Sequence, residues 1–292
     1  MLRFLALLLL PLVAACATVA PPPPAFTSDR ISVEVRGSGP DVVLIPGLSS
    51  HPQVWESSVA AVPGYRYHLV HVAGFAGKPA GANASGPVVA PVAEEIARYI
   101  AEAGLDRPAL IGHSLGGSWA MMVASRHPER ASRVMVVDMI PFMGVMFGAP
   151  NAEAVRPAAE QMRQGVATMT GEARRTMVEQ TINSMVRTES LRPGAIEQSL
   201  ASDPAVSGQA FYEVITTDLR PEIGNIRVPM TVLFVNPPNA PISAEQMEQY
   251  YRLSYANTPQ AVLKRIPDSY HFIMFDQPEV FQRELRTFLQ GS

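Results

Sequence analysis

One serine in this chain stands in a setting that suits a nucleophile. Residues 109–111 are apolar and predict a short strand, and Gly-His-Ser-Leu-Gly at 112–116 follows, before a helix expected to run to about His127. A serine on such a tight turn has a strained backbone, and the residues two positions away pass close to other backbone, so both are glycine. The N-terminus of the helix directs free N–H groups toward Ser114, which would stabilise negative charge on an acyl oxygen.

This strand, turn and helix resemble the nucleophile elbow of the α/β-hydrolase superfamily. A bare Gly-x-Ser-x-Gly also occurs in ordinary turns, but the flanking strand and helix favour the nucleophile. The resemblance covers nearly all of the chain after the N-terminal leader. It implies an α/β fold with a mostly parallel twisted sheet, helices on its faces and a helical cap insertion.

A serine hydroxyl needs a base to remove its proton. His271 follows the last predicted strand and precedes a helix expected at 278–289, which is where the family places its base. The sequence His-Phe-Ile-Met-Phe-Asp-Gln-Pro at 271–278 is similar to that of family members. His68 and His71 lie on a predicted strand and His127 ends a helix, so structural roles are favoured for these three.

The acid that would orient the base has two candidates. In the family, an Asp usually follows the strand expected here at 228–235, but the residues after it contain no acid, and Asn239 stands about where the Asp is expected. Asp138 ends the strand at 133–137, a position where certain haloalkane dehalogenases keep a Glu. We predict Asp138, because a buried imidazolium is better stabilised by a full charge, with Asn239 as the neutral alternative. Asp268 and Asp276 are less favoured because they lie too near His271 along the chain.

The residues expected around the reacting group follow from the same resemblance. Pro46-Gly47-Leu48 follows the strand at 41–45, so the N–H of Leu48 is the first predicted oxyanion donor and the N–H of Leu115 the second. Four side chains near the ends of the site strands are predicted to line the substrate pocket: Met143, Met146, Phe147 and His113.

The other elements are placed by periodicity. Strands are expected at 31–35, 41–45, 67–71, 133–137, 228–235 and 260–266. A helix at 88–103 carries Val92, Ile96 and Ile100 at helical spacing. From about 141 to 223 the sequence predicts helices only, at 151–168, 171–187, 193–202 and 207–219, with recurring methionines. By resemblance this is the cap.

The N-terminus resembles an export signal. Arg3 precedes an apolar run at 4–13 that is too short to span a membrane, and Val-Ala-Ala-Cys at 13–16 resembles a bacterial lipobox. Cys16 is the only cysteine in the chain and is the predicted site of lipidation, with a plain secretory signal as the alternative. We therefore expect a signal peptide at 1–16, a Pro-rich linker at 17–28 and a hydrolase domain at 29–292. Ala17, and not Asp, follows the cysteine, which resembles the pattern of lipoproteins sent to the outer membrane. We therefore expect a lipoprotein of the outer membrane or periplasm of a Gram-negative bacterium.

Composition narrows the classes of function. A net charge of −3 without a basic block argues against nucleic-acid binding. No metal motif or phosphate-binding loop is visible, and the predicted mechanism requires no cofactor. The favoured function is a serine hydrolase that cleaves an ester of a small, largely apolar substrate, with thioesters and amides less favoured. An acyltransferase, a carbon–carbon bond hydrolase and a catalytically weakened ligand-binding homologue stay open, and the oligomeric state is not indicated.

Overall fold

The computed structural model describes residues 26–238 and 240–291. The predicted signal peptide, Cys16 and Asn239 lie outside the described residues. In the described part of the chain, no helix is both long enough and apolar enough to cross a membrane.

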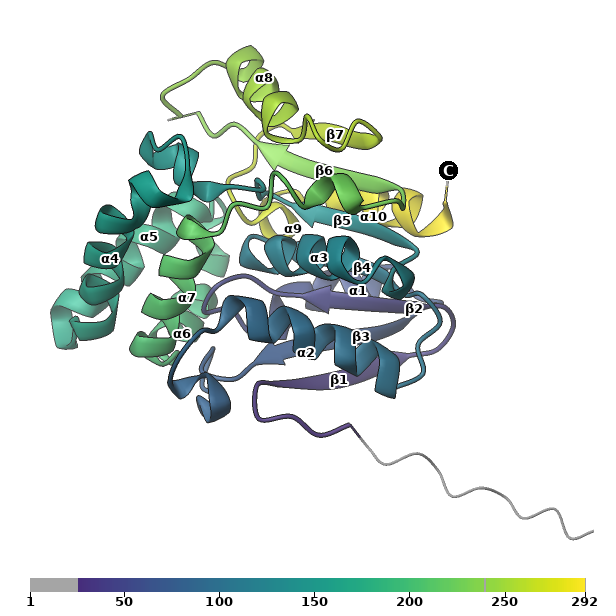
Figure 1. Cartoon of the computed structure of the whole chain (residues 1–292), viewed down its shortest axis with the longest axis horizontal. Helices are drawn as coiled ribbons and strands as arrows, with labels where there is room; N and C mark the ends of the chain where they lie inside the picture. Colours follow the sequence, from purple (N-terminus) through teal and green to yellow (C-terminus); the bar gives the residue numbers. More distant parts are fainter. Residues whose placement is uncertain (1–25, 239, 292) are drawn as a thin grey trace, which may run out of the picture.

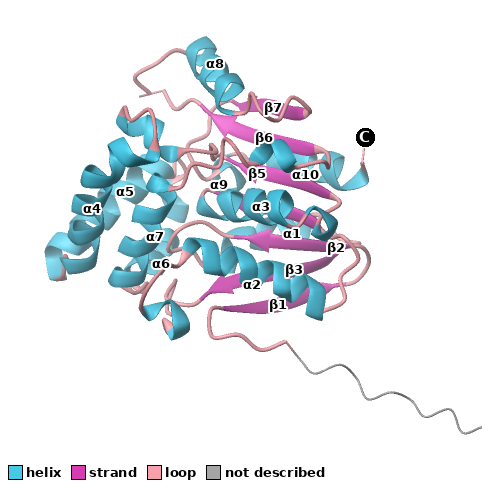
Figure 2. Cartoon of the chain, viewed as in Figure 1, coloured by secondary structure: helices cyan, strands magenta, loops and turns pink. Residues whose placement is uncertain are grey.

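A seven-stranded sheet forms the centre of the molecule (Figures 1 and 2). Its order is β1-β3-β2-β4-β5-β6-β7, with β1 antiparallel to β3 and the other neighbours parallel. The fold class predicted from the sequence is confirmed. The strands are β1 (Ile31–Gly37), β2 (Asp41–Ile45), β3 (Arg66–Val72), β4 (Ala109–His113), β5 (Arg133–Val137), β6 (Met230–Val235) and β7 (Ala261–Ile266).

Helices cover both faces of the sheet, which explains why its inner strands are apolar on both sides. In β2, Val43 and Ile45 belong to one hydrophobic core, and Val42 and Leu44 belong to the other, as the two-residue period of a strand requires. The first core is covered by α2 (Val89–Glu102), α3 (Leu115–Arg126) and α8 (Ala244–Ser254). The second is covered by α1 (Glu56–Ala61), α9 (Ile273–Asp276) and α10 (Pro278–Gln290).

One of these helices, α8, was missed by the sequence analysis, which placed no element between β6 and β7. A capping box opens it: the Ser243 side chain accepts from the backbone N–H of Gln246, and the Gln246 side chain accepts from the backbone N–H of Ser243. This Ser-x-x-Gln pattern is a helix-start signal that the sequence displays.

A helical segment connects β5 to β6 and lies beyond the carboxyl ends of the strands (Figure 1). Its helices agree with the predicted ranges to within a few residues, and no strand interrupts it. They are α4 (Ala152–Thr168), α5 (Gly171–Met185), α6 (Arg192–Leu200) and α7 (Pro204–Thr216), with short 3-10 turns at Met143–Phe147, Glu189–Leu191 and Ile223–Asn225.

Polar contacts fasten this segment to the loops at the carboxyl edge of the sheet. The hydroxyls of Ser49 and Ser207 lie 2.8 Å apart, and the Ser202 hydroxyl accepts from the backbone N–H of Ala76 at 2.8 Å. Phe272 donates its N–H to the carbonyl of Met185 at 3.2 Å. The helices are therefore attached both to the loop after β2 and to the loop after β7.

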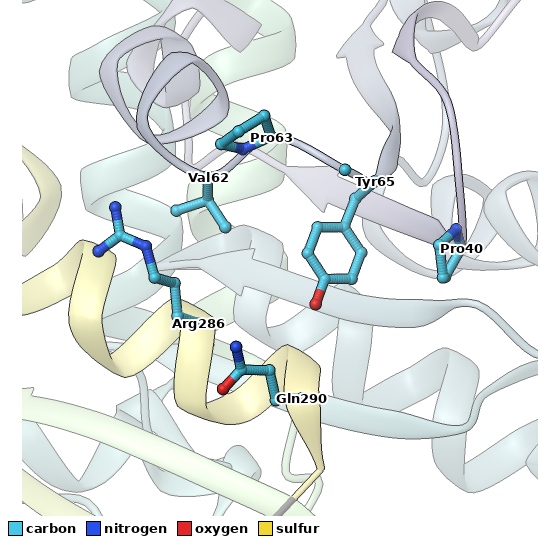
Figure 3. Close-up of a pocket in the computed structure, with 7 residues that line it drawn as sticks. Pro40, Val62, Pro63, Tyr65, Arg286 and Gln290 are labelled. Atoms are coloured by element: carbon cyan, nitrogen blue, oxygen red, sulfur yellow. The ribbon is translucent and has the colours of Figure 1, made fainter.

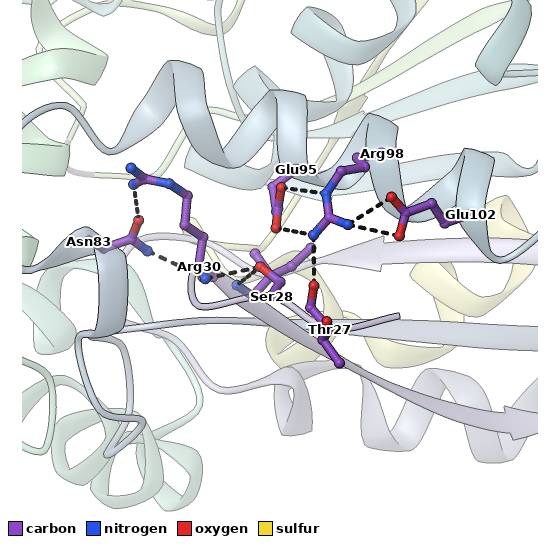
Figure 4. A network of polar contacts seen from close by, with 8 residues as sticks. Thr27, Ser28, Arg30, Asn83, Glu95, Arg98 and Glu102 are labelled. Carbon is purple, nitrogen blue, oxygen red and sulfur yellow. Dashed lines mark hydrogen bonds and ion pairs between the residues drawn. The ribbon is translucent and has the colours of Figure 1, made fainter. Parts of the chain in front are cut away.

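The first described residues run beside α2 (Figure 4). The guanidinium of Arg98 bridges Glu95 and Glu102 on its own helix and donates to the carbonyl of Thr27 at 2.7 Å. It also lies 4.5 Å from the ring centroid of Phe26. These contacts fix the chain before β1 against the body of the fold.

A surface hollow of about 300 Å³ lies near the amino ends of the strands, opposite to the end where Ser114 lies (Figure 3). Pro40 and Tyr65 line it just before β2 and β3 begin, and Arg286 lines it from α10. Ser114 instead follows the carboxyl end of β4. Ligands of open α/β sheets bind beyond the carboxyl ends of the strands, so this hollow is not the predicted site.

Candidate active site

Ser114 occupies a strained turn between β4 and α3. Its backbone has φ 53° and ψ −125°, and its N–H donates to the carbonyl of Val137 at 2.9 Å. A Cβ on Gly112 would lie 2.0 Å from the carbonyl oxygen of Gly116, and one on Gly116 would lie 2.1 Å from that of Ile45. Both glycines are therefore required by close backbone approach, as the sequence motif predicts.

The turn gives a stability prediction. Gly116→Ala is expected to lower the free energy of unfolding by about 3 kcal/mol or more, because the new methyl group would collide with backbone that cannot move independently. Gly165→Ala in α4 is the matched control: apart from the neighbouring backbone of its own helix, no atom lies within 4 Å of the added Cβ, and the variant should be more stable by about 0.5–1 kcal/mol. Urea unfolding of both variants measures the difference. Equal effects would contradict the steric account.

The structure brings His271 and Asp138 together. His271 lies in the loop between β7 and α9, and its Nδ1 is 2.6 Å from Oδ2 of Asp138. Asp138 follows β5 with a φ of 53° and donates its N–H to the carbonyl of Leu233 at 2.7 Å. The carboxylate therefore holds Nδ1 of the imidazole, which leaves Nε2 for the reacting proton.

The other carboxylate oxygen of Asp138 is held by two donors that the sequence analysis did not find. The backbone N–H of Val235 donates to Oδ1 at 3.2 Å, and the hydroxyl of Tyr251 donates to the same oxygen at 3.1 Å. Burial, with the charge of Asp138 adding to it, holds the pKa of Tyr251 well above its usual range. The hydroxyl therefore stays protonated and serves as a donor.

The loop after β2 passes against the serine. A Cβ on Gly47 would lie 3.1 Å from the Cβ of Ser114, so this loop and the elbow are in direct contact. Leu48 follows in that loop, and Leu115 is the first residue of α3. Within the described residues, neither of their N–H groups donates a hydrogen bond to the protein.

Within residues 26–238 and 240–291, no hydrogen bond joins the Ser114 hydroxyl to His271. In enzymes without a bound substrate, such catalytic hydrogen bonds are often long and tighten only when the substrate binds.

The residues from 40 to 278 match the family model of the alpha/beta hydrolase fold, which is more than half of the chain. The chain belongs to the α/β-hydrolase family. The prediction of an α/β-fold hydrolase enzyme is thereby confirmed.

Curated relatives of this α/β hydrolase include two bacterial proteins named pimeloyl-[acyl-carrier protein] methyl ester esterase. The protein from Aeromonas hydrophila is 37% identical over 38% of this chain, and the chain spans 42% of that protein's length. The protein from Vibrio atlanticus is 26% identical over 71% of this chain and 80% of its own length.

Solved structures share the fold of this α/β hydrolase. An esterase from Exiguobacterium antarcticum superimposes with a TM-score of 0.74 at 21% identity, covering 89% of this chain and 96% of the other. An enol-lactonase from Burkholderia xenovorans gives a TM-score of 0.69 at 17% identity, with 89% and 96% covered.

His113 lies behind the site of this α/β hydrolase. Its side chain is fully buried, and its Nε2 is 3.1 Å from the carbonyl oxygen of His271, so Nε2 carries the hydrogen. Burial, with the neighbouring His271 as a second cause, holds the pKa of His113 well below its usual range. His113 was predicted to line the substrate pocket. In the structure the residue is 1% exposed and its ring is hydrogen-bonded to the loop of His271, so it presents no open surface to a substrate.

The other predicted pocket residues lie in the 3-10 turn Met143–Phe147, which follows Asp138 closely. Met143 is half-buried against the first core, whereas Met146 and Phe147 are 66% and 39% exposed. The two exposed side chains are free to meet a bound molecule or solvent.

The histidines favoured for structural roles are engaged elsewhere in this α/β hydrolase. His68 bridges Asp41 and the hydroxyl of Tyr99, at 2.8 and 2.6 Å. His71 contacts the carbonyl of Phe75, and His127 contacts Glu94.

Asp276 accepts from three backbone N–H groups, those of Arg187, Thr188 and Tyr270. It therefore holds the loop around His271 and not the imidazole. Across residues 26–238 and 240–291, no group of three or more acidic, His or Cys side chains is arranged to hold a metal ion.

Proposed function

We propose that this α/β hydrolase is a serine esterase with Ser114 as nucleophile, His271 as base and Asp138 as the orienting acid. The observation that carries the proposal is the 2.6 Å contact between His271 Nδ1 and Asp138 Oδ2, at the edge of the sheet where the strained turn presents Ser114. A serine, a histidine and a carboxylate with these roles form the hydrolytic triad that recurs on unrelated folds.

The proposed reaction passes through an acyl-enzyme. Nε2 of His271 accepts the proton of Ser114 as Oγ bonds to the carbonyl carbon of the ester. The N–H groups of Leu48 and Leu115 stabilise the oxyanion, and Asp138 stabilises the imidazolium. The imidazolium then gives its proton to the leaving alkoxide, and the acyl group stays on Ser114. A water molecule, deprotonated by His271, releases the acid and restores the hydroxyl.

The proposed substrate is an ester of a small, largely apolar acid. The curated relatives are named as methyl ester esterases, which supports an ester and a small alcohol group. Half-buried apolar side chains of the helical segment, including Met143, Val145 and Phe211, pack against the first hydrophobic core, and the segment lies beyond the carboxyl ends of the strands (Figure 1). We expect the helical segment to cover the site and to select the acyl group.

A substrate panel tests the esterase proposal. The purified protein is assayed with p-nitrophenyl esters of increasing acyl length and with methyl esters of the same acids, and released nitrophenol or methanol is measured. The expected result is hydrolysis with a clear optimum of acyl length. Failure of every ester, with retained binding of a ligand, would favour a catalytically weakened homologue.

We also propose that the chain is an exported lipoprotein anchored at Cys16, on the basis of the lipobox-like residues 13–16. Cys16→Ala is expected to abolish incorporation of radiolabelled palmitate and to move the protein out of the membrane fraction of the expressing bacterium. Ser114→Ala is the control, because it should be lipidated like the wild type. A wild-type protein that never takes up the label would contradict the anchor.

A further inference from the structure

Tyr251 touches the proposed acid from an element distant in the chain. It lies on α8, 113 residues after Asp138, and its hydroxyl is 3.1 Å from Oδ1. The other oxygen, Oδ2, faces Nδ1 of His271. The two carboxylate oxygens are thus divided: one is held by the scaffold and the other by the imidazole.

The position of the Tyr251 hydroxyl is fixed by packing. The ring is 6% exposed and stacks on Phe234 of β6, with ring centroids 4.1 Å apart and planes 18° from parallel. The ring of Tyr255 lies nearly parallel to it as well, with centroids 6.4 Å apart and planes 13° from parallel. A buried ring packed against such neighbours has little freedom, so the hydroxyl cannot leave Oδ1 without disturbing the core.

The contact with Tyr251 is made to an acid that follows β5, and not β6 as is common in the family. The common family position after β6 offers no carboxylate, and the proposed acid ends β5 instead. The backbone N–H of Val235, at the end of β6, is one donor to Oδ1 of this carboxylate, and the helix that follows β6 supplies the second, the hydroxyl of Tyr251.

We propose that Tyr251 is a positioning residue: its hydroxyl holds Oδ1 of Asp138 so that Oδ2 stays aligned with His271. The inference rests on the proposed serine esterase mechanism. It assigns to α8 a role in the reaction although, in the part of the chain that the structure describes, no residue of α8 is hydrogen-bonded to Ser114 or His271. Tyr251 touches no reacting atom and acts only through the carboxylate.

Neighbouring tyrosines of the same helix region provide matched controls. The Tyr255 hydroxyl also makes a buried hydrogen bond, to the carbonyl of Met139 at 2.7 Å, but does not contact the acid. The Tyr250 hydroxyl is buried with no hydrogen-bond partner in the described residues. Tyr→Phe at each position removes one oxygen and keeps the ring.

The test compares kcat and KM of Tyr251→Phe, Tyr255→Phe and Tyr250→Phe on one p-nitrophenyl ester, together with their thermal unfolding. For Tyr251→Phe we expect kcat to fall about tenfold with KM changed less than twofold, because alignment of the base is lost and substrate contacts are not. The two control variants should keep kcat within twofold, even if Tyr255→Phe loses as much stability.

A double-mutant cycle separates positioning from a general structural effect. In an Asp138→Asn background, the added Tyr251→Phe change should alter kcat less than twofold, because the alignment that it supports is already lost. A tenfold loss that persists in this background, or one that Tyr255→Phe reproduces, would overturn the inference. If Ser114→Ala retained wild-type turnover, the proposed function would fail and the inference that rests on it would be overturned with it, whereas the two outcomes above overturn the inference alone.

Discussion

Replacing Ser114 with alanine is expected to reduce kcat for ester hydrolysis by about 10⁴-fold or more. The variant keeps the backbone N–H groups around the site but loses the hydroxyl oxygen that attacks the ester, and removal of this nucleophile from a triad lowers the rate by a factor of this order. Alanine carries the same Cβ as serine, so the strained φ of 53° should be preserved. Initial rates on a p-nitrophenyl ester measure the loss.

Ser125→Ala is the matched control. Ser125 is also buried on α3, and its hydroxyl donates to the carbonyl of Met122 at 3.1 Å, one turn back on its own helix and far along the helix from the elbow. Its kcat should stay within twofold of wild type. If Ser114→Ala kept more than a hundredth of the wild-type rate, another group would have to be the nucleophile.

Asp138→Asn is expected to reduce kcat by about 10³–10⁴-fold while KM changes little. The neutral amide cannot stabilise the imidazolium, and its NH₂ group would favour the wrong tautomer of His271. Asparagine tolerates the left-handed backbone at this position, so the loss should reflect chemistry and not misfolding. Steady-state kinetics and a thermal unfolding curve check both parts.

The comparison with Asn239→Ala decides between the two candidate acids. We expect Asn239→Ala to keep kcat within twofold, because Asp138 already occupies Nδ1 of His271 at 2.6 Å. Small and equal effects of the two substitutions would contradict the assignment of Asp138. A larger effect of Asn239→Ala would transfer the role to that side chain.

The elbow was predictable because its signature lies in one short stretch of sequence. The Gly-x-Ser-x-Gly pattern stands between an apolar strand and a helix, and Gly112 is required by the backbone of Gly116, four residues further on. The same reasoning placed the sheet strands and the helices between β5 and β6. Such features appear as patterns of residues a few positions apart, so a single sequence displays them, although the contact that requires Gly116, with the carbonyl of Ile45, is long-range.

The support around the acid was not predictable in the same way. Tyr251 and Asp138 are far apart in the chain, and nothing in the pattern of α8 says which face of the sheet it covers. The contact between His113 and the carbonyl of His271 likewise depends on how the loop after β7 folds over β4. These contacts depend on tertiary packing, which residue periodicity does not encode.

The identity of the acid was only partly predictable from the sequence. The sequence showed an Asp at the end of β5 and none after β6, but the choice between Asp138 and Asn239 rested on the energetic argument that an imidazolium prefers a full charge. The structure shows Asp138 against His271, while Asn239 lies outside the described residues.

Mapping the adduct of a fluorophosphonate probe is the most direct test of the proposed mechanism. The probe phosphonylates only a serine that a nearby base activates, and peptide mass spectrometry locates it. The account predicts one adduct per chain, on the peptide that contains Ser114, and none in Ser114→Ala. A protein that hydrolyses esters but carries the adduct on another residue, or no adduct, would contradict it.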